Sequence, residues 1–273
     1  MPNHLSAVLD AYERSGKLNV RAQDLRAALP DISDEGLRKA VYRQQERGRL
    51  VGLSQGSQHW LIVPLQHANA GAPPLEAWLH QYMSKTLATP YYVAMLSAAE
   101  TYGASPYAVM VTQVMVPERR RSITVGRHQV SFHTRTRIER MPTRWHETPD
   151  GRFKVSTPEL TVLDIIQHMA TLGGIGRVRE VLRGMWAHCA EGGFSEALDA
   201  LQNAPIAQRL GVLMELDGQA DLSRSVKHWL RDRPLRLVAL DGKPRQGRGS
   251  PDSRSVDAEF KVRIPADLRG ANT

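Results

Sequence analysis

Three short helical patterns followed by a hairpin pattern open the chain, and this order constrains the fold more than any other feature. The first helix is predicted over residues 4–15 and ends at Gly16, and the second ends before Pro30. Ser33 can cap a third helix over 33–48, because its hydroxyl accepts from the free amides of the first turn. Two apolar segments around a polar turn, LVGL and HWLIV, then predict the hairpin. This order is typical of a winged helix-turn-helix.

The segment HANAGAPP, residues 67–74, is the clearest candidate for a domain boundary, since Ala, Gly and Pro interrupt the periodic patterns there. We therefore predict a winged helix-turn-helix domain over 1–66 and a larger domain over 74–273. Beyond the boundary, strands are predicted at 107–116 and 129–138, before a mainly helical remainder. The predicted fold class is α+β: an N-terminal winged helix-turn-helix followed by a larger mixed α+β C-terminal domain.

The composition is that of a globular protein, with 41% hydrophobic and 23% charged residues. No segment reaches the roughly 18 consecutive apolar residues that a membrane span needs, and the N-terminal segment lacks a signal-peptide pattern. The single cysteine, Cys189, excludes an intramolecular disulfide and is typical of a reducing compartment, so a cytoplasmic location is predicted. The net charge of +8 favours polyanionic partners.

The third predicted helix carries the first candidate for a binding site. With Leu37 and Val41 facing the core, polar and basic side chains face outward. Such side chains can reach guanine edges and phosphates in the major groove, and the polar turn of the hairpin would be the wing tip. Alternatively, these charges only solvate the outer face of a surface helix. The predicted DNA contacts are Arg38, Lys39, Tyr42 and Arg43 on the helix, with Gln55, Ser57 and Gln58 in the turn.

A second group of basic residues lies beyond the predicted boundary. Residues 118–145 carry eight arginines and two glutamates. Alternation along the strand at 129–138 puts Arg135 and Arg137 on one face. These arginines could bind phosphates beside the wing, or they could be a solvated face that protects a sheet edge. The strand pattern therefore predicts DNA contacts from Arg135 and Arg137 in this group.

Catalytic patterns are weak throughout the chain. The Gly-Ser at 249–250 followed by Asp257 and Glu259 is superficially similar to nucleotidyltransferase and nuclease patterns, but too few residues follow to build the surrounding sheet. The glycine-rich turn at 173–177 joins two helices, whereas a phosphate cradle requires a preceding strand. The ten histidines lack metal-site spacing. We predict that the chain is not an enzyme and has no catalytic residue, metal or cofactor.

Four segments of the chain carry a resemblance to a known family. They are PYYVAMLSAAETYGAS (90–105), VTQVMVPERRRSITVGRHQVSFHTRTRI (111–138), RFKVSTPELTVLDII (152–166) and IAQRLGVLMEL (206–216). Their packing and turn residues resemble those of the AbiEi-type antitoxins of type IV toxin–antitoxin (abortive infection) systems. With the N-terminal helices and hairpin, the resemblance spans roughly the first 220 residues.

The resemblance implies a role in gene regulation and phage defence. It implies that the winged helix binds inverted repeats in the operon's own promoter, so that the chain is a sequence-specific transcriptional repressor of its own operon. It also implies that the C-terminal domain carries the antitoxin activity and supports DNA binding through its basic face. The DNA contacts that the resemblance implies on this face are Arg119, Arg120, Arg121, Arg135 and Arg137. The implied opponent is a nucleotidyltransferase-like toxin, which a type IV antitoxin opposes without a stable complex. Two alternatives stay open: a ligand-responsive winged-helix transcription factor, and a metal-dependent DNA-modifying or nucleotidyltransferase enzyme.

Overall fold

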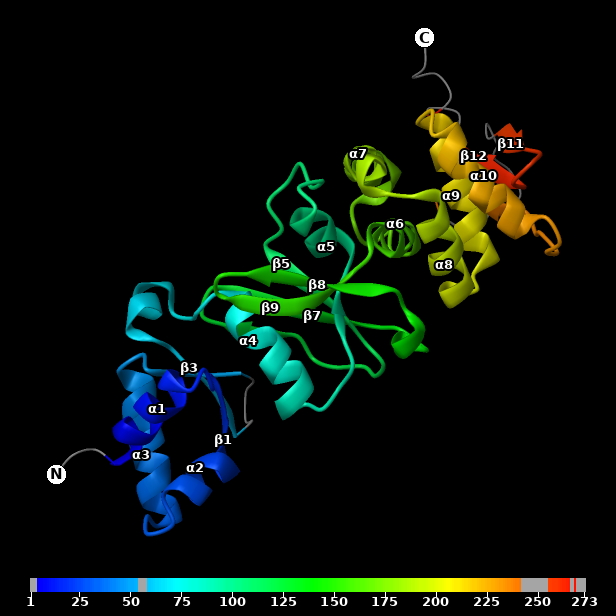
Figure 1. The fold of residues 1–273 in the computed structure, drawn as a ribbon. Helices are drawn as coiled ribbons and strands as arrows, with labels where there is room; N and C mark the ends of the chain where they lie inside the picture. The colour runs from blue at the N-terminus through cyan, green and yellow to red at the C-terminus, as the bar shows by residue number, and fades with distance from the viewer. Residues whose placement is uncertain (1–3, 54–57, 242–254, 266–267, 269–273) are drawn as a thin grey trace, which may run out of the picture. The chain divides into compact units, whose positions relative to one another are not determined.

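The computed structural model describes residues 4–53, 58–241, 255–265 and 268, and the chain divides into two compact units. The first unit comprises residues 1–93, 110–138 and 145–154. The second unit comprises residues 94–109, 139–144 and 155–273. Helices and strands occur in both units (Figure 1), which confirms the predicted α+β class.

The N-terminal part of the first unit is a small helical module with a three-stranded sheet. Its elements are α1 (His4–Arg14), β1 (Asn19–Arg21), α2 (Ala22–Ala28), α3 (Asp34–Glu46), β2 (Leu50–Gly52) and β3 (His59–Ile62). The strands lie in the order β1-β3-β2, and both pairings are antiparallel. The three predicted helices and the hairpin are confirmed, whereas β1 is an additional strand that the sequence pattern did not predict.

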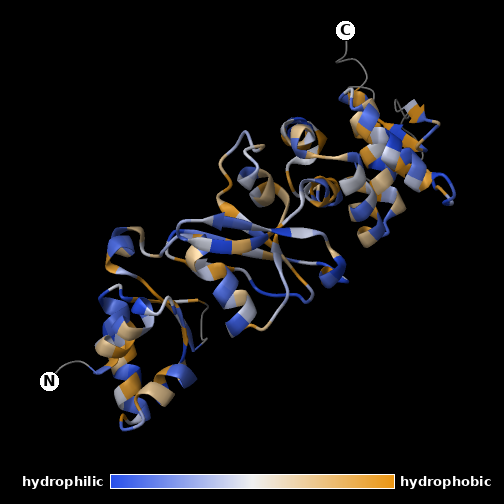
Figure 2. Ribbon diagram, in the orientation of Figure 1, coloured by the Kyte–Doolittle hydropathy of each residue, from blue (hydrophilic) through white to orange (hydrophobic). Residues whose placement is uncertain are grey.

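Apolar side chains at helical spacing form the core of this module, and Figure 2 shows hydrophobic and hydrophilic residues alternating along α1 and α3. Burial of such a side chain stabilises the fold by roughly 1.5–3 kcal/mol. The buried face also fixes the rotation of each helix, so the opposite face of α3 is exposed. The core side chains contributed by the helices include Leu5, Leu9, Leu25, Leu37 and Val41.

The chain then continues through η1 (Leu65–Ala70), α4 (Leu75–Gln81) and η2 (Tyr82–Thr86). Polar contacts of Asn19, which is only 4% exposed, join α4 to the module across the predicted linker. The backbone amide of Asn19 donates to Oε1 of Gln81 at 2.8 Å, and its side-chain amide donates to the carbonyl oxygen of Trp78 at 3.0 Å. A buried polar group left without its partner costs about 1–3 kcal/mol, so these bonds hold α4 against the module.

Six strands of the described residues form the main sheet, in the order β6-β7-β5-β4-β9-β8. Strands β5 and β7 are parallel, whereas β4 with β5 and β6 with β7 are antiparallel. The predicted strands at 107–116 and 129–138 are confirmed in part, whereas β8 and β9 were not predicted. The strands, with one short helix between β7 and β8, are β4 (Tyr92–Val93), β5 (Val111–Val116), β6 (Ile123–Val125), β7 (His128–Thr134), η3 (Ile138–Arg140), β8 (Thr143–Thr148) and β9 (Gly151–Ser156).

Helix α4 lies close to the main sheet at the start of β9 (Figure 1). A Cβ on Gly151 would meet the carbonyl oxygen of Glu76 at 2.4 Å, and Gly151 has a φ of +149°. Glycine tolerates both this φ and the close backbone approach. The side chain of Trp78 is fully buried on the same helix. Helix and strand therefore share one core.

The second unit is mainly helical, and α6 is its most buried helix. A serine and a threonine directly before Pro158 predict an N-cap at Ser156 or Thr157. The structure has the cap at Thr157, whose hydroxyl accepts from the amide of Leu160 at 3.4 Å, and Pro158 occupies the first helical position. None of the helices in the described residues is long and apolar enough to cross a membrane. The elements are α5 (Met95–Thr101), α6 (Pro158–Gln167), α7 (Gly174–Met185), η4 (Trp186–His188), α8 (Glu191–Leu201), α9 (Ala204–Leu216), α10 (Ala220–Leu230), β10 (Val238–Ala239), β11 (Ser255–Asp257) and β12 (Val262–Ile264).

The C-terminal strands form a small sheet, in the order β10-β12-β11, that is attached to α9. The side-chain amide of Gln208 donates to the carbonyl oxygens of Arg236 at 2.8 Å and Phe260 at 2.6 Å. The ring of Phe260 is 1% exposed and lies against the backbone of Gly211. The described part of the tail therefore completes the core of the second unit.

A methyl group at position 211 is expected to destabilise this core. The Cβ of Gly211→Ala would lie 2.1 Å from Cε1 of Phe260, and the buried ring cannot move without displacing its neighbours. Overpacking of this kind costs about 1–3 kcal/mol. Thermal unfolding should show a lower midpoint for Gly211→Ala than for Gly192→Ala, where a Cβ meets nothing within 4 Å. Equal midpoints would contradict the packing of Phe260 on α9.

Candidate nucleic-acid interface

Helix α3 is fixed at its start and along its inner face. The Oγ of Ser33 accepts from the amide of Gly36 at 3.1 Å, which confirms the predicted N-cap. Asp34 and Glu35 in the first turn complement the positive end of the helix dipole. Capping and burial together hold the helix in one orientation. The inner face is formed by Leu37, Ala40, Val41 and Gln44.

The outer face of α3 brings together the four residues that were predicted to contact DNA. Tyr42 is 62% exposed, which is a large exposed fraction for an aromatic side chain. Lys39 forms an ion pair with Glu35 at 2.7 Å, but both side chains remain mostly exposed. Within the described residues, no ion pair involves the guanidinium groups on this face. The four residues line a shallow hollow of about 420 Å³ and are Arg38, Lys39, Tyr42 and Arg43.

The predicted wing tip is described only at its C-terminal end. Gln55 and Ser57 lie outside the described residues. Gln58 is exposed, and its carbonyl oxygen accepts from the amide of Ala22 at 2.9 Å. This bond joins the start of α2 to the chain just before β3, so it positions the base of the hairpin.

The second predicted group of arginines is divided by burial. Arg119 and Arg121, in the connection from β5 to β6, are exposed. Arg120 between them is half-buried and donates to Oγ1 of Thr89 at 2.8 Å. Arg137 is exposed and has a φ of +53°. Three of the five arginines are therefore exposed.

The position of Arg135 corrects the prediction that Arg135 and Arg137 share an exposed strand face. Strand β7 ends at Thr134, so the alternation stops before either arginine. Arg135 is 5% exposed, and its Nε donates to the hydroxyl of Tyr92 at 3.2 Å. A guanidinium group held in this way cannot reach a phosphate in solution. Its contacts are structural.

The other residues considered for catalysis have structural contacts as well. Asp257 accepts from the amide of Phe260 at 2.8 Å, and Glu259 forms an ion pair with Lys227 at 3.0 Å. Burial raises the pKa of the Cys189 thiol, so its nucleophilic thiolate form is disfavoured. Among the residues that the structure describes, no group of three or more His, Cys, Asp and Glu side chains could hold a metal ion.

Together, fold and surface define an α+β protein whose N-terminal module exposes Arg38, Lys39 and Arg43 on one face of α3. A family model described as the AbiEi antitoxin C-terminal domain matches residues 92–216. This part of the chain belongs to that family, which confirms the resemblance seen in the sequence. The match supports a role for the chain as an antitoxin of a toxin–antitoxin system.

A solved structure shares the fold over almost the whole chain. The RV2827C protein from Mycobacterium tuberculosis aligns with a TM-score of 0.66, covering 99% of this chain and 94% of that one. The two sequences are 14% identical, so the likeness concerns the fold alone. No curated protein matches the chain.

Proposed function

We propose that the chain is the autoregulating antitoxin of a type IV toxin–antitoxin system, and that α3 reads its own promoter. The observation that carries this proposal is the exposed face formed by Arg38, Tyr42 and Arg43 on a capped helix whose opposite face is buried. Arginine can bond guanine through two atoms at once, and such contacts need a rigid support. The match of residues 92–216 to an antitoxin family supports the antitoxin role in this proposal.

The proposed binding mode divides the contacts between bases and phosphates. The face of α3 enters the major groove, with Lys39 beside it, as the second helix of a helix-turn-helix does. Arg119, Arg121 and Arg137 are the proposed phosphate contacts, because they are the exposed members of the second group. Phosphate contacts position a protein on DNA without reading sequence.

The proposed division of labour follows the predicted boundary. The part before residue 67 binds inverted repeats in the promoter, and the part from residue 74 opposes a nucleotidyltransferase-like toxin without a stable complex. Both activities take place in the cytoplasm. We assign no catalysis and no cofactor to the chain, since the tail carboxylates Asp257 and Glu259 already have structural partners.

A reporter gene fused to the chain's own promoter tests the repressor role. We expect the full-length chain, supplied from a separate plasmid, to lower reporter expression. Scrambling the inverted repeats should remove the effect, because base contacts depend on sequence whereas phosphate contacts do not. Unchanged expression with abundant, folded protein would contradict the proposal.

Replacing the exposed arginines beyond the module should change DNA binding, whereas replacing the buried Arg135 should change stability. Changing the exposed Arg119, Arg121 and Arg137 to Gln should flatten the dependence of DNA affinity on salt, by a slope of about 0.9 for each phosphate that is no longer bound. Arg135→Met should instead lower the unfolding midpoint, because it leaves the buried hydroxyl of Tyr92 without this donor. Fluorescence anisotropy across a salt series and thermal unfolding separate the two effects. An unchanged slope in the triple variant would mean that these charges only solvate the surface.

A further inference from the structure

Helix α10 carries a row of cationic side chains that the proposed function does not use. The spacing i, i+3, i+4 and i+7 puts them on one face of the helix. The opposite face is buried through Val226 and Leu230. The row continues into the residue after Leu230, which keeps a helical conformation. We call it the cationic row after its charged members, Arg224, Lys227 and Arg231; its remaining member is the imidazole of His228.

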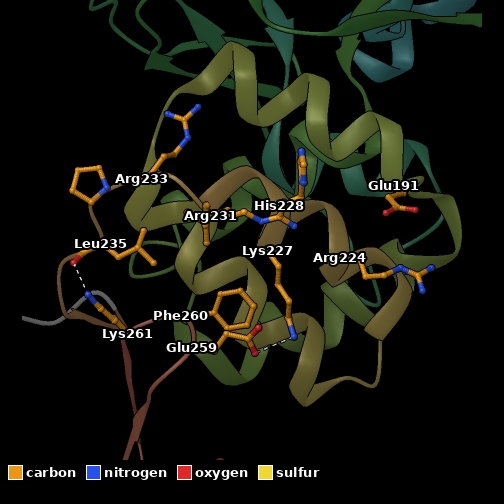
Figure 3. A pocket seen from close by; sticks show the side chains of 12 residues that line it. Glu191, Arg224, Lys227, His228, Arg231, Arg233, Leu235, Glu259, Phe260 and Lys261 are labelled. Atoms are coloured by element: carbon orange, nitrogen blue, oxygen red, sulfur yellow. Dashed lines mark hydrogen bonds and ion pairs between the residues drawn. The ribbon is translucent and has the colours of Figure 1, made fainter.

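The cationic row lines a groove of about 1040 Å³ in the second unit. Figure 3 shows the row running across the groove, with Arg233, Leu235 and Lys261 toward one end and Glu191 beyond Arg224 toward the other. Two carboxylates, Glu191 and Glu259, also line the groove. Lys227 forms ion pairs with Glu259 at 3.0 Å and with Glu215 at 2.8 Å, so its charge is neutralised. The remaining positive charge of the groove comes from Arg224, Arg231, Arg233 and Lys261. The groove is therefore predominantly positive.

Several of these cations have no strong partner. Within the described residues, Arg231 forms no ion pair. Arg224 is paired with Asp221 at 3.0 Å, but that carboxylate is 88% exposed, and exposed pairs contribute little. The ammonium group of Lys261 donates to the carbonyl oxygen of Leu235 at 3.4 Å and forms no ion pair among the residues that the structure describes. These charges remain open to an anionic ligand.

Stabilisation of α10 alone does not explain this arrangement. Cations in the last turn of a helix complement the negative end of its dipole, and this accounts for Lys227. The effect falls off within one turn, so it does not account for Arg224. Nor does it account for Lys261, which precedes β12 on the other wall of the groove.

We propose that this groove binds the sugar–phosphate backbone of a nucleic acid, without regard to base sequence. The row extends about 10 Å from Arg224 to Arg231 at 1.5 Å per residue, which is long enough for more than one phosphate. Arginine presents planar donors that match phosphate oxygens. The aromatic ring that lines the groove, Phe260, is too buried to stack on a base, so the contacts concern the backbone.

The groove adds a binding site beyond the family's domain. Apart from Glu191, its lining residues lie after residue 216, where the family match ends.

A groove for an acidic peptide would use the same cations. Peptide recognition also relies on apolar anchors in pockets, whereas Leu230 and Phe260 are already buried against the protein's own core. The observations therefore favour phosphate over peptide.

The test uses the full-length chain with Arg38→Ala and Arg43→Ala already in place, so that the result does not depend on promoter reading by α3. Arg224→Gln with Arg231→Gln removes two exposed charges from the groove. Arg140→Gln with Arg177→Gln removes two exposed charges of the second unit outside it. Anisotropy across a salt series is measured with labelled random duplex DNA, single-stranded DNA and single-stranded RNA.

We expect the groove variant, and not the control, to bind more weakly with a shallower salt dependence. For each phosphate that is no longer neutralised, the slope should fall by about 0.9 on duplex DNA or by about 0.7 on a single strand. The probe on which the groove variant and the control differ most identifies the form of nucleic acid that the groove binds. Equal slopes in the two variants on every probe would overturn the proposal. Labelled poly-glutamate is the probe for an acidic peptide. If the groove variant lost poly-glutamate binding while its nucleic-acid binding stayed unchanged, the groove would be a peptide site and the proposal would be overturned. If the groove variant unfolds, Lys261→Gln on the opposite wall gives the same comparison.

Discussion

Replacing Arg38 and Arg43 by alanine is expected to weaken binding of the full-length chain to its own promoter by about tenfold or more. A base-reading arginine contributes about 1–3 kcal/mol of discrimination, and each 1.4 kcal/mol is about tenfold in affinity. Both side chains are exposed, so the unfolding midpoint should stay close to that of the parent. Anisotropy with a labelled promoter fragment measures the affinity.

A variant with the same loss of charge elsewhere is the control for that experiment. Arg14 at the end of α1 and Arg140 are both exposed, and neither lies on the outer face of α3. Arg14→Ala with Arg140→Ala should leave promoter affinity nearly unchanged. Undiminished affinity in the α3 variant would exclude α3 as the reading element. An equal loss in the control would mean that net charge, and not position, governs binding.

Cells that express the toxin are expected to survive equally well with the parent chain and with the Arg38→Ala, Arg43→Ala variant. The reason is that the antitoxin family covers residues 92–216 and does not include α3. Both chains are produced from an unrelated promoter, so that autoregulation does not change their amounts. Colony counts after toxin induction give the result.

A variant of the second unit provides the contrast in the survival assay. Leu163 is fully buried in α6, and Leu163→Asp would place a carboxylate in the core, at a cost of several kcal/mol. We expect this chain to lose protection. Death of cells that contain abundant, folded α3 variant would show that toxin antagonism requires DNA binding, and the proposed division of labour would be wrong.

Features set by neighbouring residues were predictable from the sequence. The N-caps at Ser33 and Thr157 and the buried stripe of α3 each depend on side chains within one or two helical turns. Such signals are local, and the structure shows them where the pattern put them. For the same reason the face of Arg38, Tyr42 and Arg43 could be identified before the fold was known.

Features set by distant residues were not predictable. Strand β1 is only three residues long, and it exists because β3, much further along the chain, pairs with it. The burial of Arg135 depends on the hydroxyl of Tyr92, which is likewise distant in sequence. A period-2 pattern gives no indication of where a strand ends in the folded sheet, so it placed Arg135 on the surface.

The cationic row of α10 lies between these two cases. Its spacing of three and four residues was present in the sequence and could have been found from the periodicity of charge. The groove could not, because its other wall includes Lys261, which the fold brings next to α10. Charge periodicity indicates a face, and tertiary structure decides what lies opposite it.

The binding of the full-length chain to its own promoter, compared with the same duplex after scrambling of the inverted repeats, tests the regulatory proposal most directly. Both affinities are measured at one salt concentration, since phosphate contacts make every affinity depend on salt. Specific regulators bind their sites about a thousandfold or more tightly than other DNA. We expect a ratio of this order, which should collapse in the Arg38→Ala, Arg43→Ala variant. Equal affinity of the parent chain for both duplexes would contradict sequence-specific repression by α3.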